Sequence, residues 1–206
     1  MPSLYERYLL PRILDFAMRQ KPIMRQRDKV VPLARGRVLE IGMGSGLNLA
    51  YYDRGKLEKL WGLEPSPELR AVAERRAREA GVSVEFVGLT GESIPLDDAS
   101  VDTVVTTYTL CTIPDAERAL LEMRRVLRPA GQLLFSEHGL APDAPVARWQ
   151  DRLNPLWRRI AGGCNLNRPI DELVRGAGFA IDPIDTMYLP GPRPFTFNYW
   201  GTATRA

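Results

Sequence analysis

From Arg37 onward, short apolar runs alternate with amphipathic stretches of helical length, and this alternation limits the fold more than any other feature. Such runs indicate buried strands, and the stretches between them indicate helices that cover a sheet. Strands are predicted at residues 38–41, 59–63, 84–87, 101–107 and 132–136. The expected fold is therefore α/β: a Rossmann-like, doubly wound, mostly parallel sheet with helices on both faces.

Two of the predicted helices have clear ends. Ser66 and Pro67 start the first and Gly81 ends it, whereas Asp115 caps the second, which stops before Pro129. A shorter helix is predicted at residues 169–175. The tail, residues 180–206, has two β-prone runs separated by a turn rich in proline. It predicts an antiparallel hairpin at the sheet edge, where proline is tolerated.

Residues 1–35 precede this alternation and carry apolar side chains such as Tyr5 and Leu9 at helical spacing, interrupted by Pro11 and Pro22. They predict one or two amphipathic helices. Three roles fit such helices: a lid over a pocket, peripheral contact with a membrane, or packing on the sheet. The whole chain, 1–206, is expected to form a single domain, since roughly 100–200 residues usually close one core.

The charge balance is nearly even, with 28 Lys and Arg against 25 Asp and Glu. Because glutamates alternate with the basic residues, a solvated surface explains them and no nucleic-acid partner is expected. Cys111 and Cys164 match no zinc or redox spacing, so no metal site is predicted and a cytoplasmic location is expected. No apolar run approaches the ~20 residues of a membrane helix, and no secretion signal is expected.

The clearest chemical signal is the predicted strand 38–41 together with the glycine-rich turn that follows it. Gly42, Gly44 and Gly46 form a Gly-x-Gly-x-Gly pattern. Such glycines let the backbone turn tightly and approach a ligand, and a helix is expected next, with free N–H groups for a carboxylate or phosphate. The dinucleotide fingerprint needs glycine or alanine where Leu47 stands, which disfavours a nicotinamide cofactor.

Glu64 ends the second predicted strand, directly before Pro65. In a doubly wound fold an acid at this position faces a ribose, and one carboxylate can accept hydrogen bonds from both ribose hydroxyls. No basic residue stands beside it to bind a 2′-phosphate. Glu64 and Pro65 are therefore predicted to hold a nucleoside; the alternative is a surface acid at a turn.

With these motifs in order, residues 37–179 resemble the class I S-adenosylmethionine (SAM)-dependent methyltransferases. The resemblance implies SAM as cofactor and S-adenosylhomocysteine (SAH) as product. It places Glu40 near the methionine portion of SAM, the glycines of the turn 42–46 around that portion, and Glu64 on the ribose.

The third segment of that family usually carries an aspartate that binds adenine, and Thr90 stands in its place. The resemblance therefore implies that the Thr90 hydroxyl and the Gly91 N–H bind adenine without charge assistance. Glu92 is either a compensating acid or a surface residue. Thr107 and Tyr108 end the fourth strand and are expected beside the transferable methyl group, with Tyr108 as pocket wall and catalytic candidate.

The acceptor is expected at the end of the fifth strand, near the point where open α/β sheets bind ligands. His138, the single histidine, follows this strand and is interpreted as a general base or as a structural side chain. Residues 139–168 form an insertion near the acceptor, interpreted as a lid or as simple packing. Trp157, Cys164 and Asn165 are assigned to the acceptor pocket along with Tyr108 and His138.

The pairing of Glu137-His138 with Cys164-Asn165-Leu166 is most similar to thiol S-methyltransferases, and the N-terminal half also resembles bacterial phospholipid and quinone methyltransferases. The leading hypothesis is thus an enzyme of class EC 2.1.1 with a small-molecule acceptor. A thiol suits a sparse site because its pKa, roughly 8.5, requires little activation. The alternatives are a phospholipid or quinone acceptor, a non-catalytic SAM-binding protein, and an RNA methyltransferase suggested only by the basic charge.

Overall fold

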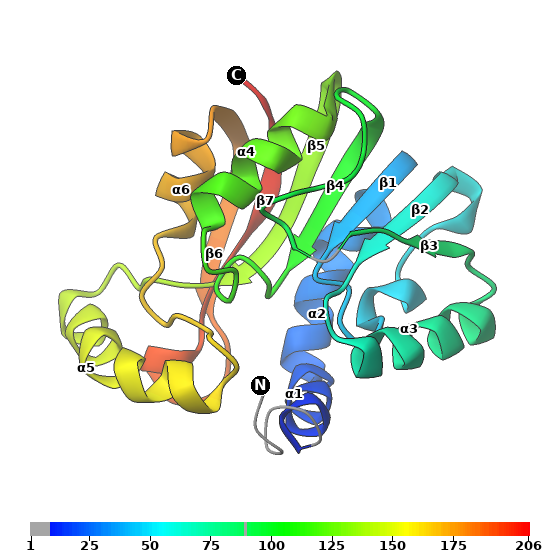
Figure 1. Cartoon of the computed structure of the whole chain (residues 1–206). Coiled ribbons are helices and arrows are strands. Elements are labelled where there is room, and N and C mark those ends of the chain that lie inside the picture. Colours follow the sequence, from blue (N-terminus) through cyan, green and yellow to red (C-terminus); the bar gives the residue numbers. More distant parts are fainter. Residues whose placement is uncertain (1–8, 89) are drawn as a thin grey trace.

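The computed structural model describes residues 9–88 and 90–206. Tyr5 of the predicted N-terminal helix and Leu89 of the third motif lie outside the described residues. The rest forms a seven-stranded sheet of order β3-β2-β1-β4-β5-β7-β6, shown in Figure 1. The strands are β1 (Gly36–Ile41), β2 (Leu57–Leu63), β3 (Val84–Phe86), β4 (Val101–Thr107), β5 (Leu127–His138), β6 (Phe179–Tyr188) and β7 (Phe197–Arg205).

The predicted strands agree with β1 to β4 to within two residues at each end, and the larger difference is at β5. β1 to β5 pair in parallel, and β7 pairs antiparallel with both β5 and β6, as the hairpin prediction required. β5 begins at Leu127 and not at Gln132, because Leu127 already pairs with Val101. The predicted turn of the hairpin, with Pro190, Gly191, Pro192 and Pro194, lies between β6 and β7 at the edge of the sheet.

The predicted helix ends are also confirmed. Ser66 caps α3 (Pro67–Ala80) through a hydrogen bond from the Leu69 N–H, and Asp115 caps α4 (Ala116–Val126) in the same way. The predicted short helix is α6 (Ile170–Gly176), and the insertion contains α5 (Ala144–Ile160). The N-terminal segment forms α1 (Leu10–Met18) and α2 (Lys21–Val30), with Pro11 and Pro22 in their first turns, where proline is tolerated.

Successive residues of the central strands point to opposite faces and build a hydrophobic core on each. Val38 packs with Val30 of α2 and Ala73 of α3, whereas its neighbour Leu39 belongs to the core that contains α4 and α6. Burial of one such aliphatic side chain contributes roughly 1.5–3 kcal/mol. Because both faces are covered in this way, the doubly wound prediction is confirmed.

The topology fixes where a ligand can bind. β1 and β4 are neighbours in the sheet, but the chain leaves them toward opposite sides, so their carboxyl ends border a crevice. α1 and α5 both lie at this edge of the sheet in Figure 1. Among the described helices, none has both the length and the apolar character needed to cross a bilayer.

Candidate active site

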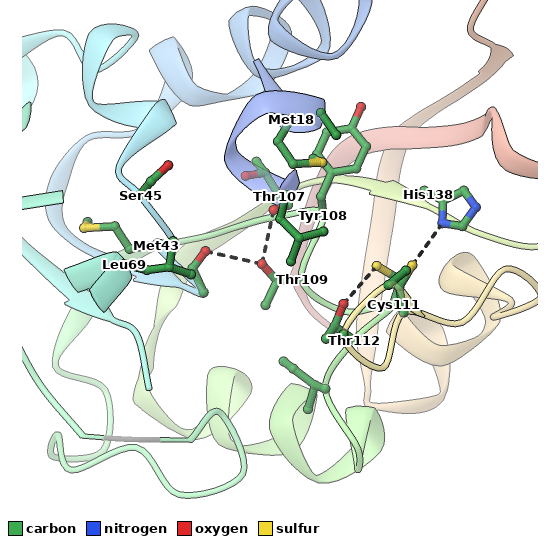
Figure 2. Close-up of a pocket in the computed structure, with 18 of the residues that line it drawn as sticks. Met18, Met43, Ser45, Leu69, Thr107, Tyr108, Thr109, Cys111, Thr112 and His138 are labelled. Atoms are coloured by element: carbon green, nitrogen blue, oxygen red, sulfur yellow. Dashed lines mark hydrogen bonds between the residues drawn. The ribbon is translucent and has the colours of Figure 1, made fainter. Parts of the chain in front are cut away.

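A cavity of about 900 Å³ opens at this crevice. Its walls come from the segments that follow β1, β2, β4 and β5, and from α1 and the end of α5. Figure 2 shows Met43, Ser45 and Leu69 at one end, and Cys111 and His138 at the other. Thr107, Tyr108 and Thr109 lie between these two ends. We call the end at Met43, Ser45 and Leu69 the cofactor end. The end at Cys111 and His138 is the acceptor end.

The glycine turn lines the cofactor end with backbone. Gly44 has a positive φ of 57°, and a Cβ added there would meet no atom closer than 3.9 Å, so this position is open to a ligand. Gly42 also lines the cavity. Gly46 does not: a Cβ there would approach the Cα of Ala73 to 3.1 Å, so Gly46 serves the packing of the turn on α3.

The helix expected after this turn is only a short 3-10 helix, Leu47–Ala50. The local reason is the packing of the turn against α3, which leaves room for a single turn before Tyr52 enters the core. The turn does not supply free N–H groups in its place, because those of Met43, Gly44 and Gly46 donate to Leu63, Glu64 and Met43.

Glu64 occupies the predicted place. Its side chain is 8% exposed, lines the cavity, and accepts hydrogen bonds from the N–H groups of Gly44 and Ser66, each at 2.8 Å. Burial raises the pKa of this carboxyl, and the two N–H donors oppose that rise. Each oxygen keeps a second lone pair for a ligand hydroxyl. Pro65 follows it on the cavity wall.

Glu40 does not line the cavity, contrary to the expectation that it lies beside the methionine portion of the cofactor. It is buried behind the turn, where it accepts hydrogen bonds from Asn48 Nδ2 at 2.9 Å and from the Tyr52 hydroxyl at 2.7 Å. Burial raises the pKa of Glu40 to about 7. The side chain therefore supports the wall of the site and leaves ligand contact to its neighbours.

One of these neighbours is Arg27, which the sequence analysis missed. Its guanidinium is buried, lines the cavity, and donates to Asn48 Oδ1 at 2.9 Å and to Thr107 Oγ1. Its Nε is buried without a hydrogen-bond partner among the described residues. A cation so placed can bind a carboxylate. The sequence did contain a signal for Arg27. It lies four residues after Ile23 and three before Val30, which places it on the buried face of α2.

The three residues predicted to lie beside adenine are on one wall of the cavity. Thr90, Gly91 and Glu92 all line the cavity, in the loop between β3 and β4. Thr90 is exposed and pairs with Ser93 in an isolated bridge. Glu92 Oε1 accepts a 3.4 Å hydrogen bond from the N–H of Asp115, so its carboxylate is tied to the start of α4.

Thr107 and Tyr108 line the cavity between its two ends (Figure 2). Tyr108 has a positive φ of 54°, which turns the chain sharply at the end of β4. Its hydroxyl donates to Asn198 Oδ1 at 2.7 Å, and burial raises its pKa. Tyr108 is therefore a wall with a fixed hydroxyl, which makes it a poor proton donor or acceptor for a substrate.

The acceptor end brings together Cys111, His138 and Cys164. Their ligand atoms all lie within 4.8 Å of one another, and His138 Nδ1 lies 3.8 Å from Cys164 Sγ. The hydrogen bond between the two thiols raises the pKa of Cys111 well above its usual value and lowers the pKa of Cys164. His138 and Cys164 line the cavity as predicted; Cys111 was not predicted to do so.

Asn165, assigned to the acceptor pocket, does not line the cavity. Its backbone N–H and its side-chain Nδ2 both donate to the carbonyl of Cys111, each at 2.8 Å. Its side chain thus joins the loop after α5 to the loop after β4. Glu137, next to His138, accepts hydrogen bonds from the N–H of Thr109 and the hydroxyl of Thr106, and burial raises its pKa to about 7.

Two helices cover the cavity. Asp15 of α1 pairs with Arg76 of α3 at 2.9 Å and accepts a hydrogen bond from Ser45, which fastens α1 across the glycine turn. From α5, Trp157 lines the acceptor end and packs on Phe195 with ring centroids 4.8 Å apart.

Comparison with known proteins gives consistent results. A family model described as a methyltransferase domain matches residues 39–135. Human thiol S-methyltransferase TMT1A is 34% identical over 82% of this chain and 71% of its own length. The demethylmenaquinone methyltransferase of Thermus thermophilus is 31% identical over 63% of this chain and 59% of its own length. Human thiol S-methyltransferase TMT1B is matched over 62% of its length.

Solved structures show the same fold. A SAM-dependent methyltransferase from Thermotoga maritima superposes with a TM-score of 0.65, at 24% identity, over 96% of this chain and 98% of its own. The methyltransferase CalH, in complex with SAH, gives a TM-score of 0.65 at 25% identity over 96% of this chain and 59% of its own.

Fold, site and relatives together define a methyltransferase of Rossmann-like architecture. The chain belongs to the class I SAM-dependent methyltransferases, and SAM is its cofactor. The cavity fits that cofactor: Glu64 offers free lone pairs to hydroxyls, Gly44 leaves open space, and the unpartnered Nε of Arg27 suits a carboxylate.

Proposed function

We propose that the chain transfers a methyl group to a small thiol held at the acceptor end of the cavity. One observation carries this proposal. The carboxylate nearest this end, Glu137, is buried and occupied by the Thr106 hydroxyl and the Thr109 N–H, so it is not free to act as a base. Such a site favours an acceptor that ionises with little help, and a thiol has a pKa of roughly 8.5.

At the cofactor end, Glu64 binds the ribose hydroxyls, and Thr90 with Gly91 borders the adenine. Arg27 binds the carboxylate of the methionine portion through its free Nε, with Glu40 and Asn48 holding the wall behind it. Bound SAM supplies an electrophilic methyl group on a positively charged sulfur. The protein residues need only align the acceptor and exclude water.

At the acceptor end, Tyr108 and Thr107 form the wall beside the methyl group, and Trp157 closes the apolar side. The acceptor thiol loses its proton at the cluster of Cys111, His138 and Cys164. Residues 1–35, through α1, and residues 139–168, through α5, act as covers that keep water out. The free cysteines suit a reducing, cytoplasmic compartment.

Apolar side chains of α1 and of the residue before it are exposed near the cavity. Leu9, Ile13 and Phe16 are 51%, 45% and 72% exposed. They support peripheral contact of this helix with a membrane surface. This feature, together with the 32% identity to the phosphatidylethanolamine N-methyltransferase of Cereibacter sphaeroides, supports a phospholipid or quinone as the alternative acceptor.

The test is SAH release from SAM with a panel of alkyl thiols, amines, phenols, quinols and phospholipid vesicles. We expect turnover with thiols, with formation of the methyl thioether confirmed by mass spectrometry. Faster turnover of a quinol or a phospholipid would replace the thiol assignment with the alternative. SAM binding without turnover of any acceptor would identify a non-catalytic binding protein.

A further inference from the structure

The acceptor end contains more chemistry than methyl transfer to a thiol requires. Two thiols and one imidazole converge there from three separate segments: the loop after β4, the end of β5 and the loop after α5. Cys111, His138 and Cys164 all line the cavity, so the space beside them is continuous with the cofactor end. His138 Nε2 is buried without a hydrogen-bond partner among the described residues.

We propose that these three side chains bind a zinc ion whose fourth ligand is the sulfur of the acceptor. The inference rests on the thiol acceptor proposed above. Two cysteines and one histidine are ligands that zinc prefers, and catalytic zinc sites keep three protein ligands with one position open to substrate. The inference departs from the expectation drawn from cysteine spacing, because the ligands are adjacent only in the folded chain.

The geometry suits zinc. Zn–S bonds of about 2.3 Å and Zn–N bonds of about 2.0 Å in a tetrahedron place these ligand atoms about 3.5–3.8 Å apart. The distance from His138 Nδ1 to Cys164 Sγ is 3.8 Å, and all three ligand atoms lie within 4.8 Å of one another. Small rotations of the two cysteine side chains therefore complete the site. Two thiolates balance the charge of Zn²⁺, as burial at this depth requires.

The surrounding hydrogen bonds hold the ligands in place. Asn165 donates two hydrogen bonds to the Cys111 carbonyl and so ties the two cysteine loops together. Arg168 donates to the carbonyls of Leu110 and Ile113, on either side of Cys111. Glu137 accepts from the N–H of Thr109 at 2.9 Å. Such outer support is typical of metal sites, whose ligands must be oriented before the metal binds.

The zinc ion would ionise the acceptor. A thiol R–SH replaces a water ligand, its proton passes to solvent, and its sulfur becomes a zinc-bound thiolate. The thiolate sulfur then forms a bond to the methyl carbon with its own electron pair, and the methyl–sulfonium bond breaks with its pair going to the sulfur of SAH. The neutral thioether is a weaker ligand than a thiolate, so water displaces it and restores the site.

Metal binding is tested first without any turnover. The full chain, purified under reducing conditions, is stripped with a chelator and titrated with Zn²⁺ or Co²⁺. We expect one ion per chain and a sulfur-to-cobalt charge-transfer band in the near ultraviolet. Cys111→Ser and Cys164→Ser should each weaken zinc affinity at least tenfold, whereas Thr186→Val, at an exposed position of β6 outside the cavity, should keep it.

SAM affinity and circular dichroism confirm that each variant is folded. Zinc affinity unchanged in the double variant Cys111→Ser/Cys164→Ser would overturn the inference. So would a Cys111–Cys164 disulfide in the protein as purified, because the sulfurs would no longer be available to zinc.

The second arm separates this inference from the proposed function. The stripped chain should methylate thiols at least tenfold more slowly than the zinc-loaded chain, and adding a thiol should shift the cobalt band. Full thiol methylation by the stripped chain would overturn the zinc inference and leave the thiol function standing. Zinc binding without turnover of any thiol would overturn both the thiol function and the acceptor as fourth ligand.

Discussion

The two ends of the cavity are built in different ways. The cofactor end uses backbone from the turn 42–46 and one carboxylate, Glu64, which lie at the ends of the neighbouring strands β1 and β2. The acceptor end uses side chains from three segments that are distant in the sequence. A site made mainly of backbone binds the same cofactor in many chains, whereas a site made of converging side chains can change its acceptor by a few substitutions.

The largest effect on activity is expected at the acceptor end, for a substitution of His138. His138→Ala should lower kcat for thiol methylation about 100-fold, because it removes one of the three groups at which the acceptor thiol is ionised. The Kd for SAM should stay within about twofold, because no cofactor-end residue bonds to this side chain. Steady-state kinetics and calorimetry measure the two quantities. Unfolding of the variant would instead support the structural role of this histidine.

A somewhat smaller effect is expected at the cofactor end. Glu64→Ala removes the carboxylate that bonds to Gly44 and Ser66 and is proposed to hold the ribose. It should weaken SAM binding by about 2 kcal/mol, roughly 30-fold in Kd. Glu74→Ala, on the exposed side of α3, is the matched control. Equal SAM affinity of the two variants would show that the ribose lies elsewhere.

The different construction of the two ends of the cavity also explains which site residues could be predicted from the sequence. Glu64, Gly42 and Gly44 could be placed at the cavity from the sequence because the carboxyl ends of parallel strands meet at one edge of a sheet. Cys111 and Asn165 could not be assigned correctly from the sequence, because their roles depend on how the loops after β4 and α5 meet.

The buried polar residues behind the turn 42–46 show a second limit. Glu40 and Arg27 both belong to the cluster around Asn48, but one supports the wall and the other faces the cavity. The side of a strand or helix that a residue occupies follows from periodicity. Which of two buried charges reaches a ligand depends on tertiary packing, which periodicity does not contain.

If α1 covers the cavity, loosening it should have a smaller effect, on the rate at which SAH dissociates. Asp15→Asn keeps the size of the side chain but removes the ion pair with Arg76, which contributes about 1 kcal/mol, the upper end for a surface pair, because both side chains are largely buried. SAH should therefore dissociate about fivefold faster, as measured by stopped-flow fluorescence. Asp53→Asn, which loses an exposed ion pair with Lys56, is the control. Equal dissociation rates in both variants would favour plain packing of α1 on the sheet.

A further effect is expected behind the cofactor end, on the pH dependence of stability. Burial raises the pKa of Glu40 to about 7, above the roughly 4.3 of an unfolded chain. The folded protein then binds this proton more tightly than the unfolded chain does. The stabilisation is complete below about pH 4.3 and is lost as the pH rises through about 7.

Glu137 is raised to about 7 in the same way, so Glu40→Gln should remove roughly half of this pH-dependent loss. A glutamine can still accept from Asn48 and can donate to the Tyr52 hydroxyl, so the variant should fold. Urea unfolding at about pH 5 and pH 8 measures the difference, with Glu74→Gln as control. Equal loss of stability between these pH values in Glu40→Gln and in the control would mean that Glu40 is ionised throughout this range. Its carboxylate would then form a permanent ion pair with Arg27 behind the cofactor.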